Sequence, residues 1–207
     1  CDGKNCRIAE HIGRLPAVFV SPSDISLVSD SPEERRRFIN SVISQMDQEY
    51  MFRLQQYNRL LAQRNALLRD GVGDMSLLAV IDAKMSTLAE GIYERRRDFC
   101  EPLAAAVNDC YHRLSNGRES VSVRYRSDLD GTDLETLLQK SIERDRIMKY
   151  TTVGVQRDDF LFSMDDYPIR RCGSQGQQKT FLLSLKMAQF ELMRTSFGFP
   201  PLLLLDD

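Results

Sequence analysis

The sequence predicts a mixed α/β fold in which a long helical arm accompanies a smaller strand-containing lobe. Two stretches with apolar residues at alternating four- and three-residue steps flank a glycine turn at residues 70–74, which indicates an antiparallel helical hairpin. Short apolar or alternating runs elsewhere indicate strands. A helix over 177–194 is apolar on most of its circumference, so a sheet or a second layer must cover it.

The first elements follow from cap and strand patterns. Residues 15–20 form a short apolar run that predicts a strand. Residues 21–24 then turn the chain into a brief helix, for which Ser23 is the expected N-cap. Ser31, Pro32 and Glu34 combine a cap, a proline at the first helical position and a glutamate three residues after the cap, which predicts a complete capping box and a strong helix start.

The arm is predicted from two apolar stripes. The first stripe comprises Tyr50, Leu54, Tyr57, Leu61 and Leu68, and Arg64 fills the one slot that lacks an apolar residue. The second comprises Leu78, Ile81, Met85, Leu88, Ile92, Arg95 and Phe99. A closed helical bundle would explain these stripes as well as a protruding coiled-coil arm does, and the role is structural in either case. Pro102 is expected to kink or restart the second helix, and Asn116-Gly117 to end it.

Three strands and one further helix, besides that over 177–194, are expected after the arm. Residues 120–125 alternate with period two, which predicts a half-exposed strand segment near 119–126. Leu134–Met148 is amphipathic and predicts a helix, and Asp159–Met164 predicts a strand. Leu202–Leu205, between two prolines and two aspartates, is expected to be a strand of a parallel sheet that is buried on both faces.

Composition limits the function classes. The 207 residues are 42% apolar and 28% charged, which is an ordinary globular balance for one large domain or two small ones. A formal net charge of −2 makes any nucleic-acid site a local patch. The longest apolar run is too short for a membrane span, and we expect no secretory leader. Because the chain starts without Met and stops at an apolar strand, we expect a piece of a longer or trimmed protein.

The cysteines predict no metal centre. They are odd in number and scattered, with no C-x-x-C pair, and His11 and His112 have no ligand-type neighbours at zinc spacing. Free thiols in a reducing cytoplasm are the expected state. The five are Cys1, Cys6, Cys100, Cys110 and Cys172.

The residues that indicate chemistry are Gly173-Ser174-Gln175-Gly176-Gln177-Gln178-Lys179-Thr180. A phosphate-binding P-loop, G-x-x-x-x-G-K-[ST], is one interpretation, but Gln178 stands where that loop needs glycine. The alternative is an ABC-type signature, in which Ser174 and the free N–H groups near Gly176 face the γ-phosphate of a nucleotide held by another subunit. Gln177 fits the last position of the usual L-S-G-G-Q pattern.

The end of the chain has the form of a Walker B motif. Four leucines, Leu202–Leu205, are followed by two carboxylates at the tip of the expected strand. Asp206 would hold Mg²⁺ through water, and Asp207 stands where a general base would polarise the attacking water. An aspartate pair that merely ends a strand is the other interpretation.

With these motifs, the chain resembles the RecF family of DNA replication and repair proteins. The resemblance rests on residues 173–180 and 202–207 and extends, in order, through 19–24, 31–38, 57–61, 63–68 and 154–159. It implies an incomplete ABC-type ATPase lobe, similar to SMC-like heads, plus a helical second lobe. On this basis residues 1–22 and 151–207 belong to the ATPase lobe and 23–150 to the helical arm.

The resemblance also implies function. RecF-type proteins close as ATP-dependent homodimers on DNA at gaps and duplex–single-strand junctions, and with RecR and RecO they support RecA loading and the SOS response in the cytoplasm. It assigns Ser174, Gln175, Gly176 and Gln177 to nucleotide contact, Asp206 to Mg²⁺ and Asp207 to catalysis. The family's Walker A lies upstream of the matching region, so we expect this stretch alone neither to bind ATP tightly nor to hydrolyse it.

Two departures from the family pattern bear on these assignments. Residues 154–159 read G-V-Q-R-D-D where the family usually has G-P-H-R-D-D, so any role of that Pro and His does not carry over. Lys179 stands where Arg is common, which keeps the charge but not the planar guanidinium.

Two arginine clusters are candidate DNA contacts. They lie on the arm's first part and on its returning helix, and a solvated helix face is the ordinary explanation for each. The resemblance makes duplex DNA the better expectation. The candidates are Arg35, Arg36, Arg37, Arg95 and Arg96. The rival functions are a non-catalytic helical protein-interaction module and a different SMC-like ATPase head.

Overall fold

The computed structural model describes residues 11–29, 31–71 and 75–206. The chain divides into two compact units: unit 1 comprises Cys1–Gln48, Asp98–Tyr125 and Phe160–Asp207, and unit 2 comprises Glu49–Arg97 and Arg126–Asp159. These bounds differ from the predicted lobes, because residues 23–48 and 98–125 cluster with the strands of unit 1 and not with the arm.

Unit 1 contains two small sheets and the long helix α8. Its elements are β1 (Ala17–Val20), η1 (Pro22–Ile25), α2 (Ser26–Ser29), α3 (Pro32–Met46), the last part of α5 (Met75–Leu114), β2 (Val121–Arg126), β3 (Asp159–Met164), β4 (Tyr167–Pro168), α7 (Ile169–Cys172), α8 (Gln175–Phe197) and β5 (Leu202–Leu205). β1 pairs with β5 in parallel, with Ala17 opposite Leu202 and Val20 opposite Leu205. The parallel arrangement of the leucine strand is as predicted, but its partner strand was not predicted. β2, β3 and β4 form the second sheet.

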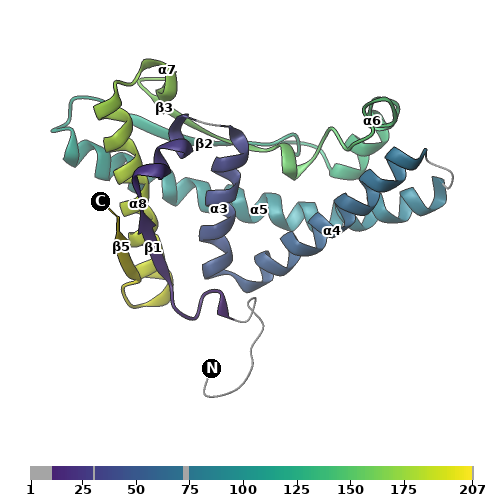
Figure 1. Ribbon diagram of the computed structural model, residues 1–207, viewed down its shortest axis with the longest axis horizontal. Coiled ribbons are helices and arrows are strands. Elements are labelled where there is room, and N and C mark those ends of the chain that lie inside the picture. Colours follow the sequence, from purple (N-terminus) through teal and green to yellow (C-terminus); the bar gives the residue numbers. More distant parts are fainter. Residues whose placement is uncertain (1–10, 30, 72–74, 207) are drawn as a thin grey trace. The chain divides into compact units, whose positions relative to one another are not determined.

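Helix α8 lies at the centre of unit 1 and contacts both β1 and α3 (Figure 1). Its apolar side chains fill the core together with those of the neighbouring elements. The sequence predicted that this helix, apolar on most of its circumference, must be covered by other elements, and it is. Fully buried examples are Val18 on β1, Ile39 on α3, and Phe181 and Leu185 on α8.

The caps at the start of the chain differ from those predicted. Ser21 and not Ser23 caps η1: its Oγ accepts a hydrogen bond from the Ser23 N–H at 3.3 Å, and the Asp24 carboxylate accepts one from the Ser21 N–H at 2.9 Å. Ser31 precedes α3 without a side-chain cap bond, so the predicted capping box is wrong. Glu34 instead accepts a hydrogen bond from Arg37 at 2.9 Å, one turn further along the helix.

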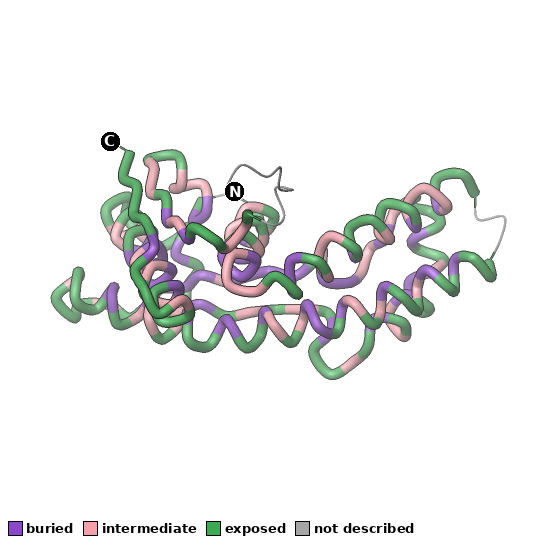
Figure 2. The backbone as a smooth tube through the Cα atoms, turned by 90° about the horizontal axis from the view of Figure 1, so that it is seen from below, coloured by how far each residue is buried: buried purple, intermediate pink, exposed green. Residues whose placement is uncertain are grey.

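Unit 2 is the predicted helical hairpin with one further helix. α4 (Gln48–Asp70) and the first part of α5 lie side by side, and α6 (Leu134–Met148) and η2 (Val155–Arg157) complete the unit (Figure 1). Buried positions recur along both hairpin helices (Figure 2). They include Tyr50, Tyr57, Arg64 and Leu68 on α4, and Leu78, Ile81, Met85, Ala89, Ile92 and Arg96 on α5. The predicted turn falls largely on residues 72–74, outside the described residues.

Arg64 joins three segments of unit 2. It is fully buried, and its Nε and Nη1 lie 2.7 Å from carboxylate oxygens of Asp82 on α5 and Asp145 on α6. Nη1 also donates to the Thr151 hydroxyl at 2.9 Å. The gap that this arginine makes in the apolar stripe is therefore filled by a buried ion-pair cluster.

Two further predictions about elements are wrong. α5 runs unbroken from Met75 to Leu114 with Pro102 inside it, because the burial of Phe99, Leu103 and Val107 at helical spacing outweighs the loss of one backbone hydrogen bond. The leucines of β5 are 40–68% exposed and not buried, since β1 is the one strand paired with β5 among the described residues. Within the described part of the chain, no helix is long and apolar enough to cross a membrane.

Candidate functional site

The first turn of α8 is built by a reciprocal cap. Ser174 is the N-cap: its Oγ accepts a hydrogen bond from the Gln177 N–H at 3.3 Å, and the Gln177 Oε1 accepts one from the Ser174 N–H at 2.7 Å. This S-x-x-Q pattern satisfies two backbone donors that would otherwise have no partner. The cap fixes the backbone of the segment that the sequence singled out for phosphate contact.

The same turn is open to solvent. Ser174, Gln175 and Gly176 are exposed. A Cβ placed on Gly176 would meet one neighbouring atom within 4 Å, the Ser174 Oγ at 3.9 Å. The first N–H groups of a helix have no acceptor within it, and the helix dipole adds partial positive charge there. The turn is thus sterically and electrostatically suited to an anionic group that approaches from outside.

The structure also bears on the P-loop interpretation. Residues 175–180 are the first turns of α8, so they leave no loop that could wrap around a phosphate. The Gln178 side chain donates to the Gly173 carbonyl at 2.9 Å and packs against the cap, and Lys179 is exposed on the helix surface. The P-loop interpretation therefore fails on geometry as well as on sequence.

A second group of polar residues lies at the carboxyl edge of the β1–β5 sheet. The Asp206 N–H donates to the Val20 carbonyl at 2.9 Å, which places the exposed Asp206 at the end of its strand. On the neighbouring helix, the buried Lys186 donates to the Phe19 carbonyl at 2.9 Å and lies 3.0 Å from the Asp24 carboxylate. In parallel sheets, ligand groups gather at this edge. Asp207, the predicted base, lies outside the described residues.

Two of the predicted DNA-contact arginines are buried. Arg35 is 7% exposed, and its guanidinium lies over the Phe162 ring at 5.8 Å. Arg96 is 1% exposed and donates to the Asp158 carboxylate at 2.6 Å. A phosphate contact needs an accessible guanidinium, so we correct the prediction for both residues.

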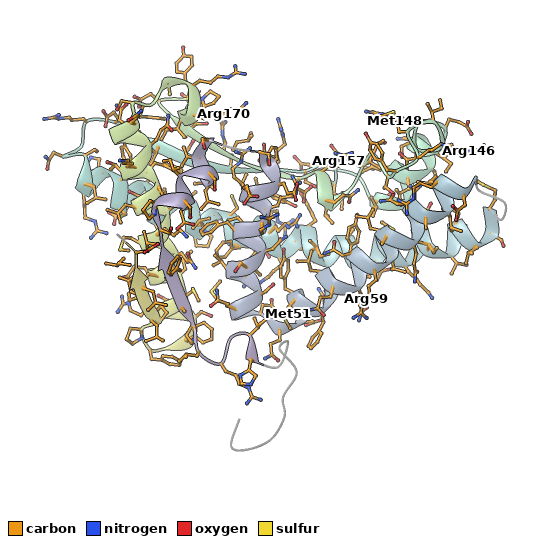
Figure 3. All side chains as sticks on the ribbon, in the orientation of Figure 1. Met51, Arg59, Arg146, Met148, Arg157 and Arg170 are labelled. Carbon is orange, nitrogen blue, oxygen red and sulfur yellow. The ribbon has the colours of Figure 1, made fainter. Side chains whose placement is uncertain are left out.

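The other three candidate arginines have accessible surface. Arg36 in unit 1 and Arg95 in unit 2 are half-buried. Arg37 is exposed and pairs with Glu33 and Glu34 on its own helix. α7 adds exposed Arg170 (Figure 3) and exposed Arg171 shortly before the α8 cap.

Sequence reasoning missed how the 154–159 segment is anchored in unit 2. Arg96 holds it, because the Nη1 atom donates to the Val155 carbonyl at 2.7 Å as well as to Asp158, and its Nε donates to the Tyr50 hydroxyl at 3.1 Å. Gly154, at φ +111°, approaches Tyr57 so closely that a Cβ would lie 2.8 Å from the Tyr57 hydroxyl. The sequence did contain a signal for this role, because Arg96 lies next to a heptad position of α5. The predicted stripe, however, assigned that position to Arg95.

Comparisons with known proteins identify the relatives of this chain. No protein-family model matches it. The chain is 40% identical over 205 residues to the DNA replication and repair protein RecF of Flavobacterium johnsoniae, covering 97% of this chain and 57% of that protein. It is 42% identical over 201 residues to RecF of Parabacteroides distasonis, covering 97% and 55%. The chain thus spans little more than half the length of the curated relatives that it matches.

Solved structures give the same answer. One described as the recombination mediator protein RecF-ATPrS in the RecFOR pathway superposes with a TM-score of 0.90 at 30% identity, covering 98% of this chain and 58% of that one. A second, described as RecF-ATP, gives a TM-score of 0.89 at 32% identity, covering 96% and 56%.

The fold and the capped, open end of α8 define part of an ABC-type ATPase head combined with a helical arm. Within that class, the sequence and structural matches are specific. Over 97% of its length the chain is similar in sequence to RecF DNA replication and repair proteins, and its structure matches the corresponding part of solved RecF structures.

Proposed function

We propose that the first turn of α8 binds the γ-phosphate of an ATP molecule held by a second protomer, and that this contact closes a RecF-type homodimer on DNA. Ser174 would offer its hydroxyl, and Gln175 and Gly176 their backbone N–H groups. The observation that carries the proposal is the exposed cap with the open face at Gly176. The ATP-containing RecF neighbours support the choice of nucleotide.

The metal and DNA assignments belong to the same proposal. Asp206, at the carboxyl edge of the β1–β5 sheet, would hold Mg²⁺, a hard cation that prefers carboxylate oxygens. Arg36, Arg37 and Arg95 remain the proposed DNA contacts. The DNA substrate would be a gap or a duplex–single-strand junction, where RecR and RecO cooperate in loading RecA in the cytoplasm.

The test uses a RecF chain of the relatives' full length that carries this sequence. We expect Ser174→Arg to abolish DNA-stimulated ATP hydrolysis, because a long cationic side chain fills the approach to Gly176 and removes the hydroxyl. ATP binding to the isolated protomer should be unchanged, since this turn faces the partner's nucleotide. Hydrolysis and nucleotide binding are measured on the same preparations.

The exposed Lys179→Arg variant is the matched control, because it adds a guanidinium to the same helix without touching the cap. It should retain hydrolysis. Normal turnover in Ser174→Arg would contradict the proposal and favour the alternative, a non-catalytic helical interaction module.

A further inference from the structure

Gln177 makes more contacts than a capping box requires. Its Oε1 accepts from the Ser174 N–H, and its Nε2 donates to the Glu119 carboxylate at 2.9 Å. Because a backbone N–H must meet an oxygen and a carboxylate must meet an N–H, these two contacts fix the orientation of the amide. The side chain that completes the cap is therefore itself held by a residue from another element.

Glu119 is held by its surroundings in unit 1. Its other carboxylate oxygen accepts a hydrogen bond from the hydroxyl of Tyr111, a buried residue of α5, at 3.4 Å. The next residue, Ser120, forms two hydrogen bonds with Asp165: the Ser120 N–H donates to the Asp165 carboxylate at 3.2 Å, and the Asp165 N–H donates to the Ser120 carbonyl at 3.0 Å. Asn108 accepts from the Val121 N–H at 3.1 Å.

The turn that supplies Asp165 is also specific. Asp165 and Asp166 both have positive φ, 46° and 68°, and join β3 to β4 as a two-residue hairpin loop. Glu119 thus directly precedes two residues, Ser120 and Val121, that are tied to this hairpin and to α5. A carboxylate in such a frame can determine where the Gln177 amide lies.

We propose that Glu119 is a positioning residue for the phosphate-facing turn of α8 and that it acts through Gln177. This inference rests on the proposed function above. Without Glu119, the Gln177 side chain can leave the Ser174 N–H, which releases the cap and lets the Ser174 hydroxyl move. Contacts to a reacting phosphate are sensitive to displacements of about 0.5 Å, so a small loss of order lowers turnover.

A reciprocal exchange tests the inference in a RecF chain of full family length that carries this sequence. Gln177→Glu keeps an acceptor for the Ser174 N–H but places two carboxylates in contact, so we expect DNA-stimulated ATP turnover to fall about tenfold or more. Adding Glu119→Gln restores the hydrogen bond with the roles exchanged, because the amide at position 119 then donates to the carboxylate at position 177. The double variant should recover turnover to within about threefold of the parent.

Glu101→Gln, an exposed glutamate of α5, is the matched control and should leave turnover unchanged. If the contact between Glu119 and Gln177 contributed only to stability, Gln177→Glu would lower the unfolding midpoint, and the double variant would not recover turnover. The positioning role is overturned if Gln177→Glu is fully active, or if the exchange does not recover turnover, while Ser174→Arg is inactive. If Ser174→Arg is itself active, the proposed function fails and this inference fails with it.

Discussion

Arg64 and Arg96 occupy interior positions of the arm where a heptad stripe is normally apolar. Each is compensated by carboxylates, Asp82 and Asp145 for Arg64 and Asp158 for Arg96. Burial raises the pKa of Asp82, and the Arg64 guanidinium opposes that rise. Such clusters add little net stability over apolar packing, but they are costly to break, because one partner alone is a buried uncompensated charge.

We expect Arg64→Met to lower the free energy of unfolding by about 3–5 kcal/mol, because Asp82 and Asp145 lose their shared partner. Urea denaturation of this chain measures the change. Arg59→Met is the control: Arg59 is exposed and points away from its helix (Figure 3), so its loss should cost less than about 0.5 kcal/mol. Equal effects of the two substitutions would show that the cluster does not stabilise the arm.

At the scale of elements, the last part of α5 places two buried weak acids in unit 1. Burial raises the pKa of the Cys100 thiol to about 11 and that of the Tyr111 hydroxyl to about 12. The Cys100 thiol also donates to the Val123 carbonyl of β2 at 3.8 Å. Both groups are therefore neutral in the folded protein at pH values where the unfolded chain has begun to lose these protons.

This arrangement predicts alkaline instability. For Cys100, stability is complete below its ordinary pKa of 9.0 and declines as pH rises toward about 11, because the native state then binds more protons than the unfolded state. The loss from this one group is about 2 kcal/mol. Unfolding midpoints measured from pH 8 to 11 test it, and Cys100→Ala should flatten the profile. Cys172→Ala, at an exposed thiol, should not; equal flattening by both would contradict the assignment to Cys100.

At the scale of the whole molecule, the proposed function gives this chain one side of a nucleotide site that a second protomer would complete. The α8 cap is suited to a phosphate from another protomer, and the full sequence contains no G-x-x-x-x-G-K-[ST] loop of its own. The chain also matches 55–57% of the length of its curated relatives. If this chain bound ATP alone, the contacts to the phosphates would come from the N-terminus of a helix, without a phosphate-binding P-loop.

We therefore expect isothermal titration of this chain with ATP and Mg²⁺ to give no binding at micromolar affinity. A full-length RecF chain that carries the sequence, titrated under the same conditions, is the positive control. Micromolar binding by this chain would mean that the described residues hold a complete nucleotide site.

The sequence alone predicted the elements whose patterns are local. The α6 and β3 bounds are as predicted, because amphipathic periodicity and apolar runs with clear ends depend on neighbours in the chain. The parallel arrangement of the leucine strand was also confirmed, whereas its partner, the first strand, was not predicted. The helix start at residues 173–176 was predicted as well, whereas the reciprocal cap between Ser174 and Gln177 was not.

Only the tertiary structure decided which charged residues are interior and which elements belong together. Arg35 and Arg96 look like solvated arginines in sequence, but aromatic and carboxylate partners from distant segments bury them. The link from Glu119 to Gln177 joins residues 58 positions apart and has no local signature. Periodicity reports which face of an element is apolar, whereas the partner that covers or neutralises a face is set by contacts between distant parts of the chain.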